Sequence, residues 1–152
     1  MPSAGDKAPD FVLPGTDGDV RLPDRLLQGR VLLAFYFEDA TPTCSTEIAA
    51  LKDAHDALCE VGAGVIAVSA DSVESHRAFA ERLGGVPFAL ASDADLSAAR
   101  AYDALAEDDP HRSRRALFVV EQDGTISYAA NPFSPNSLSQ LEEAFRALGI
   151  EL

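Results

Sequence analysis

The chain has 152 residues and a formal net charge of −13, and 47% of its residues are hydrophobic and 24% charged. This length fits a single domain, residues 1–152, which can bury a core without help from disulfides or a metal. The acidic balance argues against nucleic acids and anionic membrane surfaces as partners, because both attract basic patches.

The two cysteines are too few for a secreted disulfide scaffold. Residues 1–10 lack the apolar segment of a signal peptide. The longest apolar run, residues 31–37, is far shorter than the roughly 20 residues of a membrane span. We therefore expect a cytoplasmic protein that does not enter a membrane.

The first predicted elements are a hairpin, a strand and a helix. Residues 10–14 and 19–22 flank the turn dipeptide Asp17-Gly18, which predicts a short N-terminal β-hairpin. Residues 31–37 are continuously apolar and include β-branched and aromatic members, which indicates a buried central strand. Apolar positions at helical spacing then predict one helix over residues 42–58.

The second half of the chain continues to alternate between strands and helices. Ser72 is a plausible N-cap for one of these helices, and Gln122-Asp123-Gly124 reads as a hairpin turn. The predicted strands are 65–69, 88–91, 117–121 and 126–129, and the predicted helices are 72–83, 97–105 and 135–148. This order indicates an α/β or α+β fold.

The residues with the clearest chemical potential lie where the predicted central strand leads into the first helix. Thr41 can cap that helix through its hydroxyl, Pro42 suits the first helical position, and Cys44 then falls in the first turn. Free N–H groups and the positive end of the helix dipole favour an anion there, so the thiol would form the thiolate that attacks a peroxide oxygen. The same N–H groups and the Thr41 hydroxyl could hold the peroxide while its O–O bond breaks. Cys44 could equally be a small buried apolar residue, as free cysteines often are.

The segment 35–47 resembles the active-site signature of the peroxiredoxins, closest to the bacterioferritin-comigratory-protein (Q-type) branch. Thr41 and Cys44 match the threonine and the peroxide-reducing cysteine of that signature. Further similarity covers nearly the whole chain, in the segments 5–11, 69–80 and 115–120, in Ser92-Asp93 and at Tyr102.

The resemblance implies a thioredoxin-like fold, with a central mixed β-sheet flanked by helices and an N-terminal β-hairpin. It implies a thiol-dependent peroxidase that uses no cofactor and reduces hydrogen peroxide or organic hydroperoxides through a sulfenic acid on Cys44. It also implies that Arg115 is the active-site arginine.

Arg115 and Glu47 have chemistry that fits such a site. A guanidinium near Cys44 would favour the thiolate and offer a fixed fork of donors to peroxide oxygens. Glu47 lies one turn past Cys44 and could orient Arg115 by a bidentate pair. From the residues alone, Arg115 could instead be a surface charge, and Glu47 an ordinary acid in the first helical turn. With the resemblance, the predicted catalytic residues are Cys44, Thr41, Arg115 and Glu47.

Two positions depart from the pattern of the family. Phe37 stands where the family has a proline that helps to wall the peroxide pocket, and Ala49 stands where many Q-type members have a resolving cysteine. Cys59 would lie about 22 Å from Cys44 along one continuous helix, whereas a disulfide needs Cα atoms within roughly 7 Å. We therefore expect a one-Cys mechanism.

The reductant would then be external: thioredoxin, a glutaredoxin-like protein or a low-molecular-weight thiol. A redox-sensing thiol switch and an inactive binding scaffold on the same fold are the alternative functions. Both a monomer and a homodimer are compatible with the resemblance. No zinc site is expected, because His55, His76 and His111 are scattered, and His55 and His76 are predicted to lie on helix surfaces.

Overall fold

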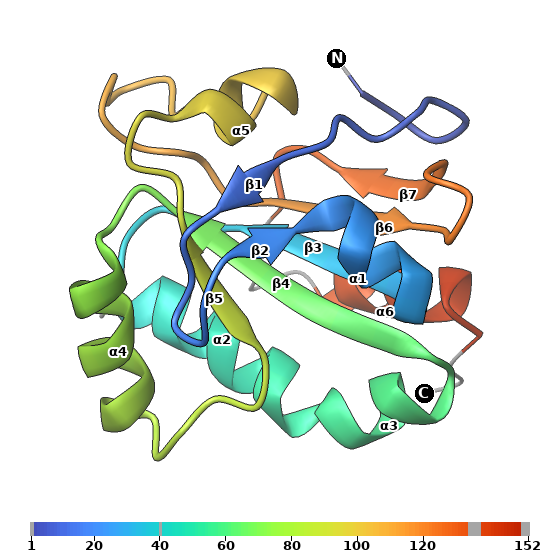
Figure 1. Ribbon diagram of the computed structural model, residues 1–152, viewed down its shortest axis with the longest axis horizontal. Helices are drawn as coiled ribbons and strands as arrows, with labels where there is room; N and C mark the ends of the chain where they lie inside the picture. The colour runs from blue at the N-terminus through green and yellow to red at the C-terminus, as the bar shows by residue number, and fades with distance from the viewer. Residues whose placement is uncertain (1, 40, 134–137, 150–152) are drawn as a thin grey trace.

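The computed structural model describes residues 2–39, 41–133 and 138–149 and has a five-stranded mixed sheet at its centre (Figure 1). The sheet order is β5-β4-β3-β6-β7; β3, β4 and β5 run parallel, and β6 is antiparallel to both β3 and β7. The strands of this sheet are β3 (Arg30–Phe35), β4 (Ala63–Ser69), β5 (Ala89–Ser92), β6 (Ala116–Val120) and β7 (Ile126–Ala130). This is the α/β architecture with a mixed sheet that the sequence predicts.

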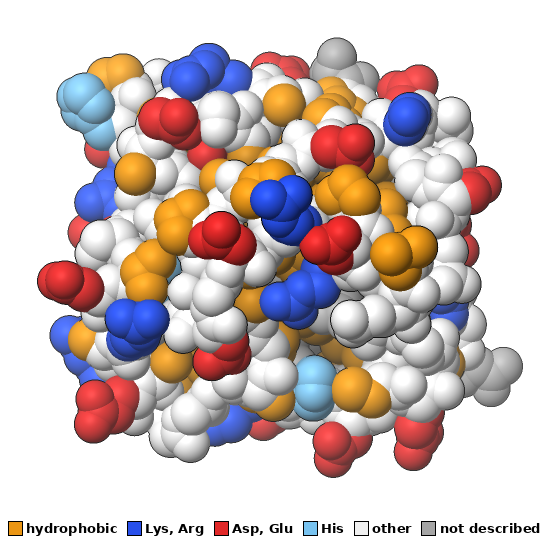
Figure 2. Space-filling model, in the orientation of Figure 1, with side chains coloured by type: hydrophobic (Ala, Val, Ile, Leu, Met, Phe, Trp, Pro, Cys, Tyr) orange, Lys and Arg blue, Asp and Glu red, His pale blue; other side chains and the backbone are white. Residues whose placement is uncertain are grey.

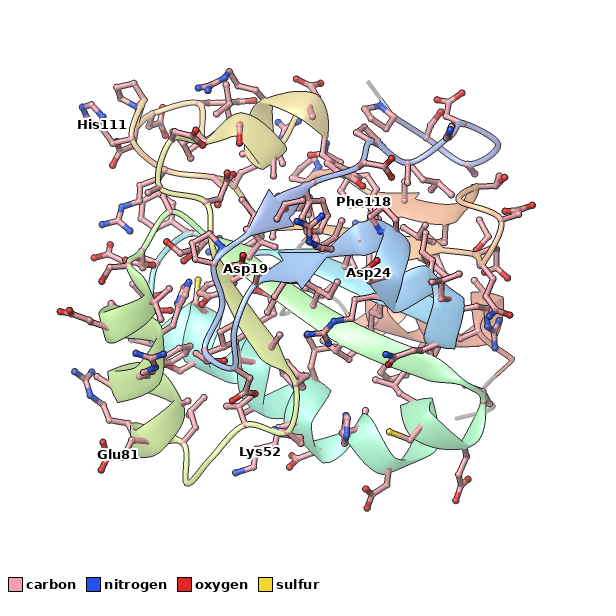
Figure 3. All side chains as sticks on the ribbon, in the orientation of Figure 1. Asp19, Asp24, Lys52, Glu81, His111 and Phe118 are labelled. Atoms are coloured by element: carbon pink, nitrogen blue, oxygen red, sulfur yellow. The ribbon has the colours of Figure 1, made fainter. Side chains whose placement is uncertain are left out.

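Alternating side chains of the sheet build one core on each of its faces. In β3, Leu33 and Phe35 point to one face, whereas Leu32 and Ala34 point to the other. This period of two is expected for a strand that is covered on both sides. Phe118 of β6, labelled in Figure 3, lies on the same face as Phe35.

The face with Phe35 is covered by the N-terminal segment and two short helices. The N-terminal hairpin pairs β1 (Val12–Leu13) with β2 (Val20–Arg21), in front of the sheet in Figure 1. The helices on this side are α1 (Leu22–Gln28) and α5 (Ser97–Ala101). The sequence prediction missed α1 and extended the second strand into it, although Pro23 in its first turn and Gly29 after its end are ordinary helix signals.

The opposite face is covered by four helices. These are α2 (Pro42–Asp53), α3 (His55–Glu60), α4 (Val73–Arg82) and α6 (Leu138–Ala147). The prediction of one helix over 42–58 is wrong, because the chain turns at Ala54 between α2 and α3. Both helices can thereby pack apolar side chains, such as Leu51 and Leu58, against the same face of the sheet. The predicted start of the last helix, residues 135–137, lies outside the described residues.

The predicted N-cap of α4 is present, since the Ser72 hydroxyl accepts the N–H of Ser75 at 3.1 Å. Acidic and basic side chains are interspersed on the face that carries the hairpin and α1 (Figure 2). None of the helices in the described ranges has both the length and the apolar character needed to cross a membrane.

Arg30 is the first residue of β3, at the end of the strand far from the loop that leads to Cys44. Its side chain forms hydrogen bonds with residues at the ends of two helices. Its guanidinium donates to the carbonyls of Val61, at 3.0 Å, and Leu148, at 2.6 Å, which follow α3 and α6. Its backbone N–H donates to the carbonyl of Gly62 at 3.0 Å. The preceding residue, Gly29, leaves no room for a side chain, because a Cβ atom there would collide with the Gly62 carbonyl.

Gly29→Ala should lower the free energy of unfolding by about 1–3 kcal/mol, since the added methyl group forces two backbone segments apart. Gly64→Ala is the matched control, because a Cβ atom at this strand position meets nothing within 4 Å. Urea denaturation of the two variants tests this. Equal stabilities would show that the Gly29–Gly62 contact is not tight.

Candidate active site

Cys44 lies in the first turn of α2, directly after the loop that follows β3. Thr41 is the N-cap of this helix, Pro42 occupies its first position, and the N–H of Cys44 donates to the Thr41 hydroxyl oxygen at 3.4 Å. The Thr41 hydroxyl donates its proton to the carbonyl of Glu38 at 3.2 Å, so a lone pair of the hydroxyl oxygen faces the helix. The cap that the sequence predicts is therefore present. The Cys44 side chain has no solvent-exposed surface.

Arg115 reaches Cys44 because of the antiparallel pairing of β3 with β6. The register places Phe35 opposite Ala116, so the residue that precedes β6 emerges beside the loop that follows β3. The Nη1 atom of Arg115 donates to Cys44 Sγ at 3.9 Å across 71 positions of sequence. The carbonyl of Arg115 accepts the N–H of Phe133 at 2.8 Å, which holds its backbone from the other side.

Glu47 is buried one turn after Cys44, but it does not form the predicted pair with Arg115. Neither of its carboxyl oxygens has a hydrogen-bond partner in the described part of the chain. The carboxyl faces a cavity of about 10 Å³, no larger than one water molecule, with Leu51, Leu117 and Phe133 among its walls.

Burial in these apolar surroundings raises the pKa of Glu47 from its usual 4.5 to about 8, although the charge of Arg115 acts in the opposite direction. Glu47 is therefore a neutral acid at neutral pH. Among the described residues, no carboxylate forms an ion pair with the Arg115 guanidinium, which lies beside Cys44.

Comparison with known proteins identifies the family. The family model described as AhpC/TSA matches residues 4–129. The putative peroxiredoxin bcp of Coxiella burnetii is 32% identical over 128 residues, which cover 81% of this chain and 84% of that relative. A chloroplastic 2-cysteine peroxiredoxin of Chattonella marina is 35% identical over 157 residues, covering 95% and 77% of the two chains. The crystal structure of peroxidoxin BcpB from Mycobacterium tuberculosis superposes with a TM-score of 0.88 at 27% identity, over all of both chains. The chain belongs to the AhpC/TSA family.

It is a peroxiredoxin and hence a thiol peroxidase on a thioredoxin-like fold, as the resemblance implies. Its second cysteine, Cys59, lies on a different helix from Cys44. Cys59 is exposed on α3, with its Sγ 3.4 Å from His55 Nε2, and both thiols are free. Ala49, which stands where many Q-type members have a resolving cysteine, is a half-buried residue of α2.

Phe37, the substitution for the family's proline, lies in the loop between β3 and α2. It packs against the core that contains Cys44. Together with Arg114 and Pro132 it also lines a solvent-open hollow of about 280 Å³. The bulky Phe37 side chain thus contacts the core that contains Cys44 and also borders this hollow.

The sequence prediction for His76 is wrong. His76 has no exposed surface and contacts Asp39, which belongs to the loop before Cys44. The polar neighbours Glu74 and Arg77 favour a helix-surface position for this segment, and both of them are indeed exposed. The signal that could have identified it is Phe79, since residues three apart share a helix face and Phe79 is buried. No group of three or more metal-ligating side chains is found within the described ranges.

Glu47→Gln should change how the stability of the protein depends on pH. The pKa of Glu47 is higher in the folded protein, so its stabilising contribution is complete below about pH 4.5 and is lost as the pH rises through about 8. The unfolding free energy of the variant relative to wild type should therefore increase by about 2–4 kcal/mol across that interval.

Urea denaturation at a series of pH values measures this difference. Glu81→Gln is the control, because Glu81 projects outward from α4 (Figure 3) and is exposed, and its curve should follow that of wild type. Parallel curves for Glu47→Gln and wild type would mean that Glu47 is ionised in the folded protein.

Proposed function

We propose that Cys44 is the residue that reduces the hydroperoxide, with Thr41, Arg115 and Glu47 completing its site. The thiolate sulfur attacks one peroxide oxygen, so that an S–O bond forms as the O–O bond breaks. Cys44 becomes a sulfenic acid, and the leaving oxygen takes up a proton and departs as water or an alcohol. The observation that carries this proposal is the 3.9 Å contact from Arg115 Nη1 to Cys44 Sγ at a helix N-terminus.

Each neighbour has a role that follows from its chemistry. The guanidinium of Arg115 stabilises the thiolate and offers further N–H donors to the peroxide oxygens. Thr41 fixes the first turn of α2 through its cap. Glu47, being neutral, does not draw the guanidinium away from the sulfur, as an ionised carboxylate in this apolar site would.

We further propose a one-Cys cycle. Cys44 is enclosed on α2, whereas Cys59 is exposed on α3 beyond the turn at Ala54. Since a disulfide needs Cα atoms within about 7 Å and suitably directed Cβ atoms, we expect the sulfenic acid of Cys44 to await an external thiol.

Thioredoxin, a glutaredoxin-like protein or a low-molecular-weight thiol could serve as that reductant, and the reducing cytoplasm supplies such thiols. Because Cys44 has no exposed surface, the first turn of α2 must open before a thiol can reach its sulfur. This opening is smaller for a low-molecular-weight thiol than for a protein.

Brief treatment with one equivalent of hydrogen peroxide and a sulfenic-acid trap should modify wild type and Cys59→Ser equally and leave Cys44→Ser unmodified. The reason is that Cys44 lies in the first turn of a helix with the Arg115 guanidinium beside its sulfur, whereas Cys59 lies near the end of α3 and its sulfur contacts the His55 imidazole. Intact-mass spectrometry measures the adduct.

Other outcomes have distinct meanings. Loss of two protons in wild type, with trapping only in Cys59→Ser, would assign Cys59 a resolving role and overturn the one-Cys cycle. Trapping at Cys44 without turnover by any thiol would favour a redox sensor. An unreactive Cys44 would remove the proposed role of this site altogether.

Phe37→Ala should widen the approach to Cys44 from the hollow beside Arg114 and Pro132. We expect the ratio of kcat/KM for cumene hydroperoxide to that for hydrogen peroxide to rise about tenfold, as removal of a blocking apolar group typically allows. Leu27→Ala is the control, since Leu27 is 83% exposed on α1 and lies outside this hollow. An unchanged ratio would show that Phe37 does not border the substrate path.

A further inference from the structure

A network of buried polar side chains lies behind the loop that leads to Cys44. Asp39 is at its centre, and His76 and Tyr36 beside it have no exposed surface. Asp39 Oδ1 accepts the hydroxyl of Tyr36 at 2.6 Å, and Oδ2 accepts the hydroxyl of Ser75 at 2.8 Å. His76 Nδ1 lies 3.0 and 2.8 Å from the same two oxygens.

Both imidazole nitrogens of His76 have polar partners. His76 Nε2 lies 2.9 Å from the carbonyl oxygen of Ala91, which can only accept, so Nε2 carries a proton. Nδ1 faces the Asp39 carboxyl, and the Tyr36 proton is already directed at Oδ1. Nδ1 also lies 3.1 Å from the Tyr36 hydroxyl oxygen, so it contacts both Asp39 and Tyr36. The imidazole thereby joins the Tyr36 and Ser75 hydroxyls as a polar partner of the buried Asp39 carboxyl, which offsets the cost of its burial.

A second carboxylate holds the backbone of the same loop. The N–H of Asp39 donates to Asp71 Oδ2 at 2.9 Å, and Asp71 also accepts from Ser69 and Arg112 at 2.6 Å each. Burial would raise the pKa of Asp71, but these hydrogen bonds and the charge of Arg112 lower it below the usual value. Asp71 is thus ionised, and the loop is held on one side by a charged group.

The remaining titratable groups around the pair are Tyr36 and Glu38. Burial, together with the charge of Asp39, raises the pKa of Tyr36 well above its ordinary value, so its hydroxyl keeps its proton. The Glu38 carboxylate lies 3.8 Å from Arg112 at the protein surface. The His76–Asp39 contact is therefore bordered by the Tyr36 hydroxyl on the inside and by the Glu38–Arg112 ion pair at the surface.

The network connects directly to the cap of α2. Glu38 immediately precedes Asp39, and its carbonyl accepts the Thr41 hydroxyl. A fixed Asp39 holds that carbonyl in place, which turns the oxygen lone pair of Thr41 toward the N–H of Cys44. Loss of the imidazole would leave the Asp39 carboxylate buried with one donor fewer and would release the loop.

We propose that His76 is a positioning residue for Cys44, which acts by fixing Asp39 and, through Asp39, the Glu38 carbonyl that accepts the Thr41 hydroxyl of the α2 cap. In the described part of the chain its ring nitrogens contact Tyr36, Asp39 and the carbonyl of Ala91, and not the sulfur. The proposal rests on the proposed role of Cys44 and adds a group from α4 to that site.

The test compares His76→Phe, His76→Asn and Ser72→Ala, all in the Cys59→Ser background so that Cys44 is the only thiol. Two rates are measured across the neutral range of pH: alkylation of Cys44 by iodoacetamide, and its oxidation by hydrogen peroxide under sulfenic-acid trapping. His76→Phe retains a ring without donors and should slow both reactions about tenfold and displace their pH profiles. His76→Asn retains an amide N–H that can donate to Asp39 and should recover most of the rate.

Ser72→Ala is the matched control, because it removes the cap of α4 without touching Asp39. Its rates should stay within about twofold of the background, since a lost cap costs only about 1 kcal/mol. Equal slowing in Ser72→Ala and His76→Phe would overturn the proposal, as would unchanged rates in His76→Phe.

If His76→Phe does not fold, a double-mutant cycle of His76→Asn with Asp39→Asn decides the question. Coupled effects on the alkylation rate are expected, and additive effects would refute a path through Asp39. Alkylation that depends on His76, combined with a Cys44 that peroxide does not oxidise, would retain the positioning role and refute the proposed function.

Discussion

The antiparallel pairing of β3 with β6 is the constraint on which the candidate site depends. It aligns the carboxyl end of one strand with the amino end of the other, and Phe35 stands opposite Ala116. Arg115 therefore meets the helix that begins at Pro42, although the two belong to distant parts of the chain. Both strands are buried on two faces, so a slip of register by one residue would exchange the side chains that pack in the two cores. The packing of the core therefore stabilises the register that places Arg115 beside Cys44.

The parallel pairing of β3, β4 and β5 has a second consequence at the same edge. Parallel strands end together, so Asp39 and Asp71, in the loops after β3 and β4, and the carbonyl of Ala91, near the end of β5, lie within reach of α4. These polar groups satisfy one another instead of water. This end of the sheet therefore carries the Cys44 thiol on an apolar core and, behind it, a hydrogen-bonded network that contacts the loop before Cys44.

Asp39 and Glu47 are both buried near Cys44, but the cost of burying their carboxyl groups is offset in different ways. Asp39 lies among loop residues that provide hydroxyl and imidazole partners. Glu47 faces apolar side chains, has no partner among the described residues, and avoids its charge by holding a proton. Because Glu47 is neutral, the charge of Arg115 acts on the sulfur without an opposing carboxylate beside it.

Local rules in the sequence determined the elements and the helix start: the strand patterns, the Thr41 cap, Pro42 at the first position and Cys44 in the first turn all follow from neighbouring residues. Arg115 was found only through resemblance to a family, because no local pattern records which strand will pair with β3. Tertiary structure alone decided the turn at Ala54, the burial of His76 and the unpaired state of Glu47. Each of these depends on the surface that a helix meets when it packs on the sheet, and the free energy of that contact comes from residues far away in the chain.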